Sequence, residues 1–131
     1  KQINIIKGLI DRDDVRQAIG IINEMKDEVS KGKNFVIFPE GTRSKDGNNL
    51  GPFKGGTFKS AMKAKAPIVP VALIDSFKPF DTPGTSEVCV QIHYLKPIKY
   101  EEYKDMNTTQ VADMVRTRII EKIKKEEKVK F

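Results

Sequence analysis

The residues best suited to chemistry follow directly after an apolar run at residues 35–38. Glu40, Gly41, Thr42 and Arg43 supply a carboxylate, a flexible backbone position, a hydroxyl and a guanidinium. The apolar run predicts a buried strand, and ligands of open α/β sheets bind at the carboxyl ends of strands. Gly41 permits a tight turn or a close approach of backbone to ligand. Because the planar fork of Arg43 matches a phosphate group, the segment predicts an anion site.

Two further cations are candidates for the same site. Arg12, like Arg43, follows an expected strand, and in a parallel sheet both then lie at one edge, where they can converge on one anion. Lys54 follows a polar turn at residues 44–49, expected to be a mobile surface loop, and adds a point charge. Plainer interpretations stay open: arginines paired with nearby carboxylates, Glu40 as a turn carboxylate, and Lys54 as a solvated lysine at a helix start.

The first part of the chain predicts a β-α-β unit. Apolar segments at residues 3–6 and 34–38 predict strands, and such a connection makes them parallel. Asp13 or Asp14 is expected to cap the intervening helix, and Gly32 to follow its end. The apolar face of this helix is formed by Val15, Ala18, Ile22, Met25 and Val29.

The remaining elements complete an α/β pattern. They are a helix at 54–64 with small residues for packing on a sheet, a strand at 68–74, a loop at 76–86, a strand at 87–95 and a helix capped by Asn107 or Thr108. Pro70 predicts an edge or an irregularity. The strand at 87–95 has Val88, Val90, Ile92 and Tyr94 on one side, and the last helix repeats Val111, Val115, Ile119 and Ile123. We expect a mixed, largely parallel sheet flanked by helices, with residues 1–131 forming part of one domain.

The net charge of the chain indicates which classes of partner it is expected to bind. The net charge is +6 and the isoelectric point about 9.4, which favours anionic partners. The sequence contains no recognised nucleic-acid motif, so nucleic acid is not expected. The lysines of residues 122–131 are interpreted as a solvated helix end, with an anionic membrane surface as the alternative. No apolar run approaches the roughly twenty residues that span a bilayer.

Four segments carry a family resemblance. They are Gly8-Leu9-Ile10-Asp11-Arg12, Phe38-Pro39-Glu40-Gly41-Thr42-Arg43-Ser44, Pro52-Phe53-Lys54-Gly55-Gly56 and Ala66-Pro67-Ile68-Val69-Pro70-Val71-Ala72. In order and rough spacing they resemble blocks of the glycerolipid acyltransferases, the family of 1-acyl-sn-glycerol-3-phosphate acyltransferase.

The resemblance implies an activity and a set of site residues. The family transfers an acyl group from acyl-CoA or acyl-carrier protein to the free hydroxyl of 1-acylglycerol 3-phosphate, giving phosphatidic acid. The acyl donor is a co-substrate, and no cofactor or metal is expected. By resemblance, Arg12 and Arg43 bind the acceptor phosphate and Glu40 is part of the acceptor site, within acceptor-binding blocks at about 8–12, 38–56 and 66–72. From their own chemistry, Gly41 and Thr42 are expected to supply backbone N–H and hydroxyl donors to the phosphate, and Lys54 a point charge. A place at the cytoplasmic face of a membrane, peripheral or anchored by a preceding segment, is also implied.

One departure from the family concerns catalysis. The catalytic block of the family, His-x-x-x-x-Asp, precedes the block that ends in Asp11-Arg12, and it is absent from this sequence. We therefore expect the catalytic dyad upstream of Lys1 and no catalytic residue within residues 1–131. The one histidine, His93, is followed five positions later by Ile98 rather than aspartate, and it is interpreted as a surface or packing residue.

These observations lead to one expectation and one alternative. We expect this chain to be the C-terminal, acceptor-binding part of an acyltransferase domain, inactive without the upstream dyad. The alternative is a non-catalytic phosphate- or lipid-binding module of the same fold.

Overall fold

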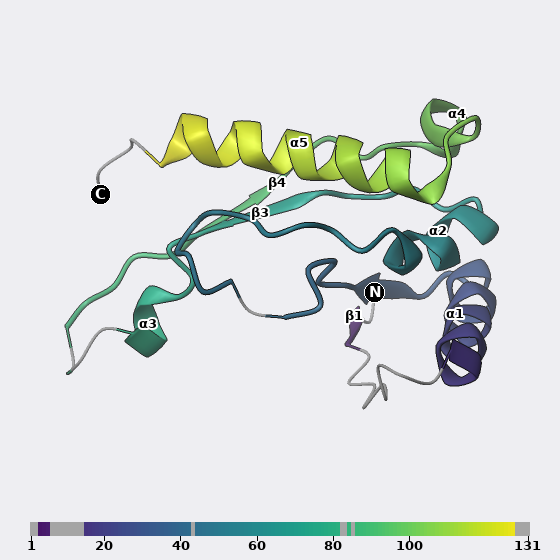
Figure 1. The fold of residues 1–131 in the computed structure, drawn as a ribbon, viewed down its shortest axis with the longest axis horizontal. Coiled ribbons are helices and arrows are strands. Elements are labelled where there is room, and N and C mark those ends of the chain that lie inside the picture. Colours follow the sequence, from purple (N-terminus) through teal and green to yellow (C-terminus); the bar gives the residue numbers. More distant parts are fainter. Residues whose placement is uncertain (1–2, 6–14, 43, 82–83, 85, 128–131) are drawn as a thin grey trace.

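A computed structural model describes residues 3–5, 15–42, 44–81, 84 and 86–127 of the chain. The elements in chain order are β1 (Ile3–Ile5), α1 (Val15–Ser30), β2 (Asn34–Val36), the 3-10 helix η1 (Gly55–Phe58), α2 (Lys59–Lys63), β3 (Val71–Ile74), α3 (Lys78–Asp81), β4 (Gln91–Tyr94), α4 (Tyr100–Tyr103) and α5 (Thr108–Glu126). Helix α5 lies along β3 and β4 on one side of the molecule, and α1 lies beside α2 on the other (Figure 1).

The β-α-β unit at the start of the chain is confirmed. Strands β1 and β2 pair in parallel, with Ile3 opposite Asn34. Helix α1 ends at Ser30, and Gly32 follows its end as expected, with a φ of 92° in the left-handed region. The Gly32 N–H donates to the Val29 carbonyl at 2.9 Å and the Lys33 N–H to the Glu28 carbonyl at 3.2 Å, the pattern of a Schellman cap. The expected caps Asp13 and Asp14 lie outside the described residues.

The core forms beneath α5. Its predicted stripe of Val111, Val115, Ile119 and Ile123 is buried, together with Ala112. These side chains share one core cluster with Phe58, Ala72, Ile74, Ile98 and Tyr103. Asn107 caps the helix as expected: its Oδ1 accepts from the Gln110 N–H at 2.8 Å, and Gln110 Oε1 accepts from the Asn107 N–H at 3.0 Å.

The predicted helix at 54–64 exists as two joined pieces, η1 and α2. Two of its small residues, Gly55 and Ser60, lie against helices rather than against a sheet, which corrects the sequence prediction for these positions. A Cβ at Gly55 would lie 3.3 Å from both the carbonyl carbon and Oγ1 of Thr108, at the start of α5. Ser60 is buried, with its hydroxyl 3.8 Å from Met25 Sδ of α1. Small side chains thus let this segment lie between α1 and α5.

The α/β class is confirmed, but the sheet differs from the one expected. The described strands form two separate two-stranded sheets, β1–β2 parallel and β3–β4 antiparallel. The irregularity expected at Pro70 is present: an isolated bridge joins Ile68 to Ile98, and the Leu95 N–H donates to the Pro70 carbonyl at 2.9 Å. Apolar periodicity predicts where strands lie but not which strands pair, and this explains the difference.

Two apolar surfaces expected to be buried are exposed. In β4 the exposed side carries Ile92 and Tyr94, at 56% and 77% exposure, because α5 covers the opposite face of the β3–β4 sheet. Phe38, just after β2, is 64% exposed because no described element covers it. The structure also adds helices that the sequence analysis did not predict, α3 within the expected loop at 76–86, and α4.

The polar turn at 44–49 is held in place by hydrogen bonds. Ser44 Oγ donates to the Asn49 carbonyl at 2.8 Å. Asn48 joins the turn to the end of β3, since its Oδ1 accepts from the Asp75 N–H at 2.8 Å and its Nδ2 donates to Asp75 Oδ1 at 2.9 Å. Asp75 has a φ of 62° and binds Lys78 Nζ at 3.0 Å. These bonds attach the turn to the end of β3, and its expected mobility stays a prediction.

Substitution of Tyr103 tests the polar contact at the centre of the core. Tyr103 is fully buried, which raises the pKa of its hydroxyl, and that hydroxyl donates to the carbonyls of Ala66 at 2.5 Å and Ala61 at 3.3 Å. We expect Tyr103→Phe to lower the free energy of unfolding by about 1–2 kcal/mol in denaturant titrations, because the Ala66 carbonyl loses its side-chain donor. Tyr100→Phe is the control, and an equal effect of both substitutions would contradict the assignment.

The Asn48–Asp75 contact predicts a dependence of stability on pH. The hydrogen bond from Asn48, and then that from Lys78, lowers the pKa of Asp75. A carboxylate whose pKa is lower in the folded state stabilises the fold above its unfolded pKa, about 4, and loses this contribution as the pH falls through the folded value. Asn48→Ala should raise the Asp75 pKa in an NMR titration and weaken the loss of stability below about pH 4. Asn49→Ala, whose side chain binds Asp46, should leave the Asp75 titration unchanged.

Candidate acceptor site

The segment from Phe38 to Gly41 forms a tight turn directly after β2. The Gly41 N–H donates to the Phe38 carbonyl at 3.1 Å, and Gly41 has a φ of 70°, a conformation that glycine adopts without strain. The Lys54 N–H donates to the Pro39 carbonyl at 2.9 Å. This bond joins the turn to the residue before η1, so two of the sequence segments with candidate site residues lie side by side.

One of the two carboxylate oxygens of Glu40 is held by a hydrogen bond. Its Oε2 accepts from the Gly51 N–H at 3.0 Å, so Glu40 binds a segment eleven residues further along the chain. Position 51 is suited to glycine, because a Cβ there would lie 3.2 Å from Glu40 Oε2. Within the described residues, Oε1 of Glu40 accepts no hydrogen bond. That oxygen is the one available to a ligand hydroxyl or a further donor.

The Lys54 ammonium lies against the Gly41 backbone. A Cβ added at Gly41 would lie 2.9 Å from Lys54 Nζ, so a side chain at position 41 would displace the ammonium. The salt bridges found among the described residues do not involve Lys54. A positive charge is therefore placed beside the turn, where it can attract an anion.

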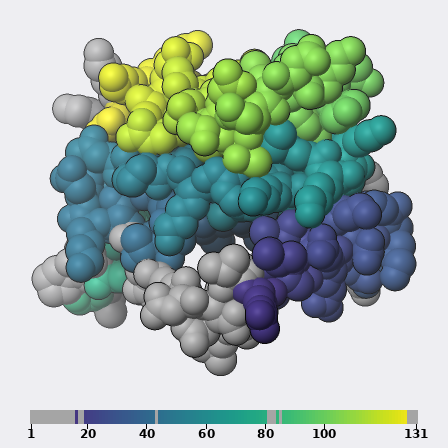
Figure 2. Space-filling model, turned by 45° about the vertical axis from the view of Figure 1, so that its right-hand side comes forward, coloured from purple at the N-terminus to yellow at the C-terminus, as the bar shows by residue number. Residues whose placement is uncertain are grey.

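A pocket of about 400 Å³ opens beside this turn, lined by Glu40, Thr42, residues 44–46 and residues 49–51. In Figure 2 the blue to teal surface of this part of the chain runs beside the green to yellow surface of α5. The structure thus brings together Glu40, Gly41, Thr42 and Lys54, as the sequence predicted. Arg12 and Arg43 lie outside the described residues, and their convergence on one anion stays a prediction.

Two residues at the site were missed by the sequence analysis. Gly51 supplies the N–H that binds Glu40. Arg116, on α5, donates from Nε to the Gly51 carbonyl and from Nη2 to the Leu50 carbonyl, each at 2.9 Å. The spacing in the sequence does indicate where Arg116 lies. Arg116 comes four residues after Ala112, which is buried, and therefore lies at the edge of the apolar stripe of α5. A charged residue there needs a polar partner.

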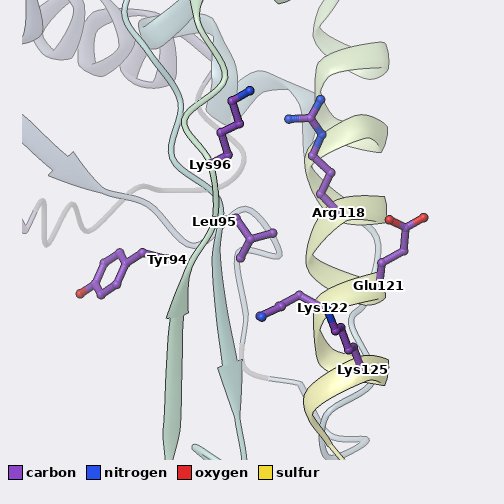
Figure 3. Close-up of a pocket in the computed structure, with 7 residues that line it drawn as sticks. All are labelled: Tyr94, Leu95, Lys96, Arg118, Glu121, Lys122 and Lys125. Atoms are coloured by element: carbon purple, nitrogen blue, oxygen red, sulfur yellow. The ribbon is translucent and has the colours of Figure 1, made fainter.

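A second groove is basic and lies between the end of β4 and the C-terminal half of α5 (Figure 3). Its volume is about 350 Å³, and it is lined by Tyr94, Leu95, Lys96, Arg118, Glu121, Lys122 and Lys125. Lys122 Nζ binds Glu126 Oε1 at 2.9 Å, a contact that lowers the pKa of Glu126. Figure 3 shows Lys96 and Arg118 extending from opposite walls toward each other, so two like charges share one end of the groove.

His93 does not form a catalytic pair in the described structure. Its Nε2 lies 2.9 Å from Gln91 Oε1 on the half-buried side of β4. This agrees with its interpretation as a surface or packing residue. Lys1, upstream of which the catalytic dyad is expected, lies outside the described residues, so the place of the dyad stays a prediction. Among the described helices, none combines the length and the apolar character required to cross a bilayer.

Comparison with known proteins identifies relatives. The model of the acyltransferase family matches residues 6–74, more than half of the chain. A chloroplastic 1-acyl-sn-glycerol-3-phosphate acyltransferase of Brassica napus is 38% identical over 115 residues, which is 84% of this chain and 31% of the relative. The 1-acyl-sn-glycerol-3-phosphate acyltransferase of Escherichia coli is 33% identical over 116 residues, 88% of this chain and 47% of the relative. The chain thus spans less than half the length of each.

A solved structure supports the fold. The crystal structure of the 1-acyl-sn-glycerophosphate acyltransferase PlsC of Thermotoga maritima superposes with a TM-score of 0.63 at 24% identity, covering 79% of this chain and 44% of that one. The family match includes the turn at Glu40 and the residues that hold it, from Gly51 to Lys54. The chain therefore belongs to the acyltransferase family, as its four sequence blocks predicted.

Proposed function

We propose that this chain forms the acceptor-binding part of an enzyme that acylates 1-acylglycerol 3-phosphate to phosphatidic acid. The names of the relatives from Brassica napus and Escherichia coli support this acceptor. The observation that carries the proposal is structural: Glu40 and Thr42 line one pocket, and the Lys54 ammonium lies against Gly41 in the same turn. A carboxylate, a hydroxyl and a cation so arranged suit a phosphorylated glycerol, which offers hydroxyl donors and an anion.

The reaction that this site would serve is acyl transfer from a thioester. The free hydroxyl of the acceptor attacks the thioester carbonyl, a C–O bond forms, the C–S bond breaks, and the proton of the hydroxyl ends on the leaving thiol. A hydroxyl needs a general base for this attack. We assign that role to the His-x-x-x-x-Asp block of the family, which this sequence does not contain. The acyl donor is proposed to be acyl-CoA or acyl-carrier protein, with no further cofactor.

Each residue of the turn has a proposed task. The free oxygen of Glu40 accepts a hydrogen bond from a glycerol hydroxyl, while its other oxygen stays bound to the Gly51 N–H.

The phosphate of the acceptor is bound by the donors around the turn. Thr42 and Lys54 donate to the phosphate, and Arg43 and Arg12 complete the anion site as planar forks of donors. Gly41 keeps the backbone free of a side chain where Lys54 approaches. Held in place before the acceptor binds, such groups lower the entropic cost of reaching a reactive geometry.

The basic groove supports a second partner, an anionic membrane surface. Lys96, Arg118 and Lys125 form no ion pair among the described residues, so their charges are available to lipid headgroups. Each such cation contributes about 1 kcal/mol near an anionic bilayer. A surface that holds the enzyme at the bilayer would also hold it near a lipid acceptor, at the cytoplasmic face proposed for the enzyme.

The acceptor site is tested by steady-state kinetics of the full-length protein with lysophosphatidic acid and acyl-CoA. We expect Arg43→Ala to raise KM for lysophosphatidic acid about tenfold or more and to leave KM for acyl-CoA unchanged, because a charge-assisted bidentate contact to phosphate is lost. Lys59→Ala removes an exposed charge on α2 and serves as the control. Unchanged KM in Arg43→Ala would refute the role of Arg43. Acceptor binding without any turnover would favour the non-catalytic module.

Co-sedimentation with vesicles tests the membrane proposal. Substitution of Lys96 and Lys125 together by glutamate should lower binding to vesicles rich in phosphatidylserine by at least about tenfold, and the difference should shrink at high salt. Lys59 and Lys104, both exposed and outside the groove, provide a control pair with the same change in net charge. Equal loss of binding in the two pairs would show a general charge effect and contradict a specific role for the groove.

A further inference from the structure

We infer that Arg116 is a positioning residue for the acceptor site, acting on Glu40 through the peptide bond between Leu50 and Gly51. The inference deepens the proposed function and rests on it for the role of Glu40. Arg116 lies 65 residues from Gly51 in sequence and comes from a different element, α5. No sequence block with candidate site residues includes it.

The contacts define a clamp on two successive carbonyls. Arg116 Nε donates to the Gly51 carbonyl and Nη2 to the Leu50 carbonyl, both at 2.9 Å. The guanidinium is planar and rigid, so two such bonds fix the orientation of both peptide groups relative to α5. No salt bridge found among the described residues includes Arg116, so its charge is directed at these carbonyls.

The geometry of a trans peptide carries this orientation to Glu40. In a planar trans peptide the C=O and the N–H point in opposite directions. The structure contains no cis peptide among its described residues. When Arg116 holds the Leu50 carbonyl toward α5, the N–H of the same peptide, that of Gly51, must point away from α5. That N–H donates to Glu40 Oε2 at 3.0 Å. The guanidinium also polarises the peptide and strengthens its N–H as a donor.

The anchor of the clamp is rigid. Arg116 directly follows the buried Val115 and lies four residues after the buried Ala112, on a helix whose stripe packs into the core. Glu40 lies on a turn with no buried side chain of its own. The clamp therefore transfers the fixed position of α5 to a loop that the core does not hold directly. Lysine cannot replace arginine here, because one ammonium lacks the planar fork that serves two carbonyls.

The first experiment measures kinetics of the full-length enzyme with Arg116→Met and Arg116→Lys. Both should raise KM for lysophosphatidic acid about tenfold or more, and KM for acyl-CoA should stay unchanged. Lys124→Met, an exposed position on the same helix, is the control and should match the parent. In a Glu40→Ala background, which removes the acceptor of the Gly51 N–H, the further effect of Arg116→Met should shrink to less than about threefold, because the two residues act through one contact. Equal effects in both backgrounds, or a parallel rise of both KM values, would overturn the inference.

The second experiment observes the clamp without activity. In the ¹⁵N-labelled full-length protein, the Gly51 amide proton should exchange with solvent at least about tenfold faster in Arg116→Met and Arg116→Lys than in Lys124→Met. If the Gly51 amide proton exchanges with solvent as slowly in Arg116→Lys as in Lys124→Met, the proposed role of Arg116 as a clamp is refuted. If the parent enzyme does not acylate lysophosphatidic acid, the proposed function fails, and the exchange of Gly51 alone decides whether Arg116 orients this peptide.

Discussion

The packing of the α5 apolar stripe against β3 and η1 is the interaction on which the rest of the structure depends. Helix α5 buries five apolar side chains, and burial of each large aliphatic side chain stabilises a fold by roughly 1.5–3 kcal/mol. The stripe covers the face of the sheet that carries Ala72 and Ile74, and Gly55 lets η1 approach the start of the same helix. Because α5 contacts both β3 and η1, it fixes the position of the sheet relative to the segment that continues from the candidate site (Figure 1).

The candidate site has few buried apolar contacts and is held mainly by polar ones. Three contacts attach the walls of the site to the surrounding fold. Asn48 binds Asp75, which follows β3, and the Lys54 N–H binds the Pro39 carbonyl. Arg116 of α5 binds the carbonyls of Leu50 and Gly51. Each is a hydrogen bond across a long sequence separation, and each ends on backbone or on a fixed carboxylate. The pocket is open to solvent and several of its lining residues are polar, and hydrogen bonds to the surrounding scaffold hold its walls in place.

The sequence predicted those features that depend on local chemistry. The place of Gly32 after the end of α1, the cap at Asn107 and the stripe of α5 follow from spacing and residue type, and all three are confirmed. Glu40 lies in a turn that Lys54 contacts, while the role of both residues in an acceptor site stays a prediction. Pairing of strands, the exposed side of β4 and the role of Arg116 depend on contacts between distant segments. A single sequence taken by itself does not specify these, since periodicity identifies an apolar face but not its partner.

The exposed apolar segment after Lys33 has a consequence for handling the protein. Residues 34–38 combine two aromatic and two β-branched side chains without a charge, a composition that promotes intermolecular β-pairing and aggregation. Among the described residues, β1 is the strand that pairs with β2, and an edge left without a partner strand offers unpaired backbone groups. A cation at Lys33 and a proline at Pro39 flank the segment, and both residue types oppose the addition of further strands. Lys33 and Pro39 therefore fit the pattern in which a charge and a proline flank an apolar strand and protect it from pairing with other chains.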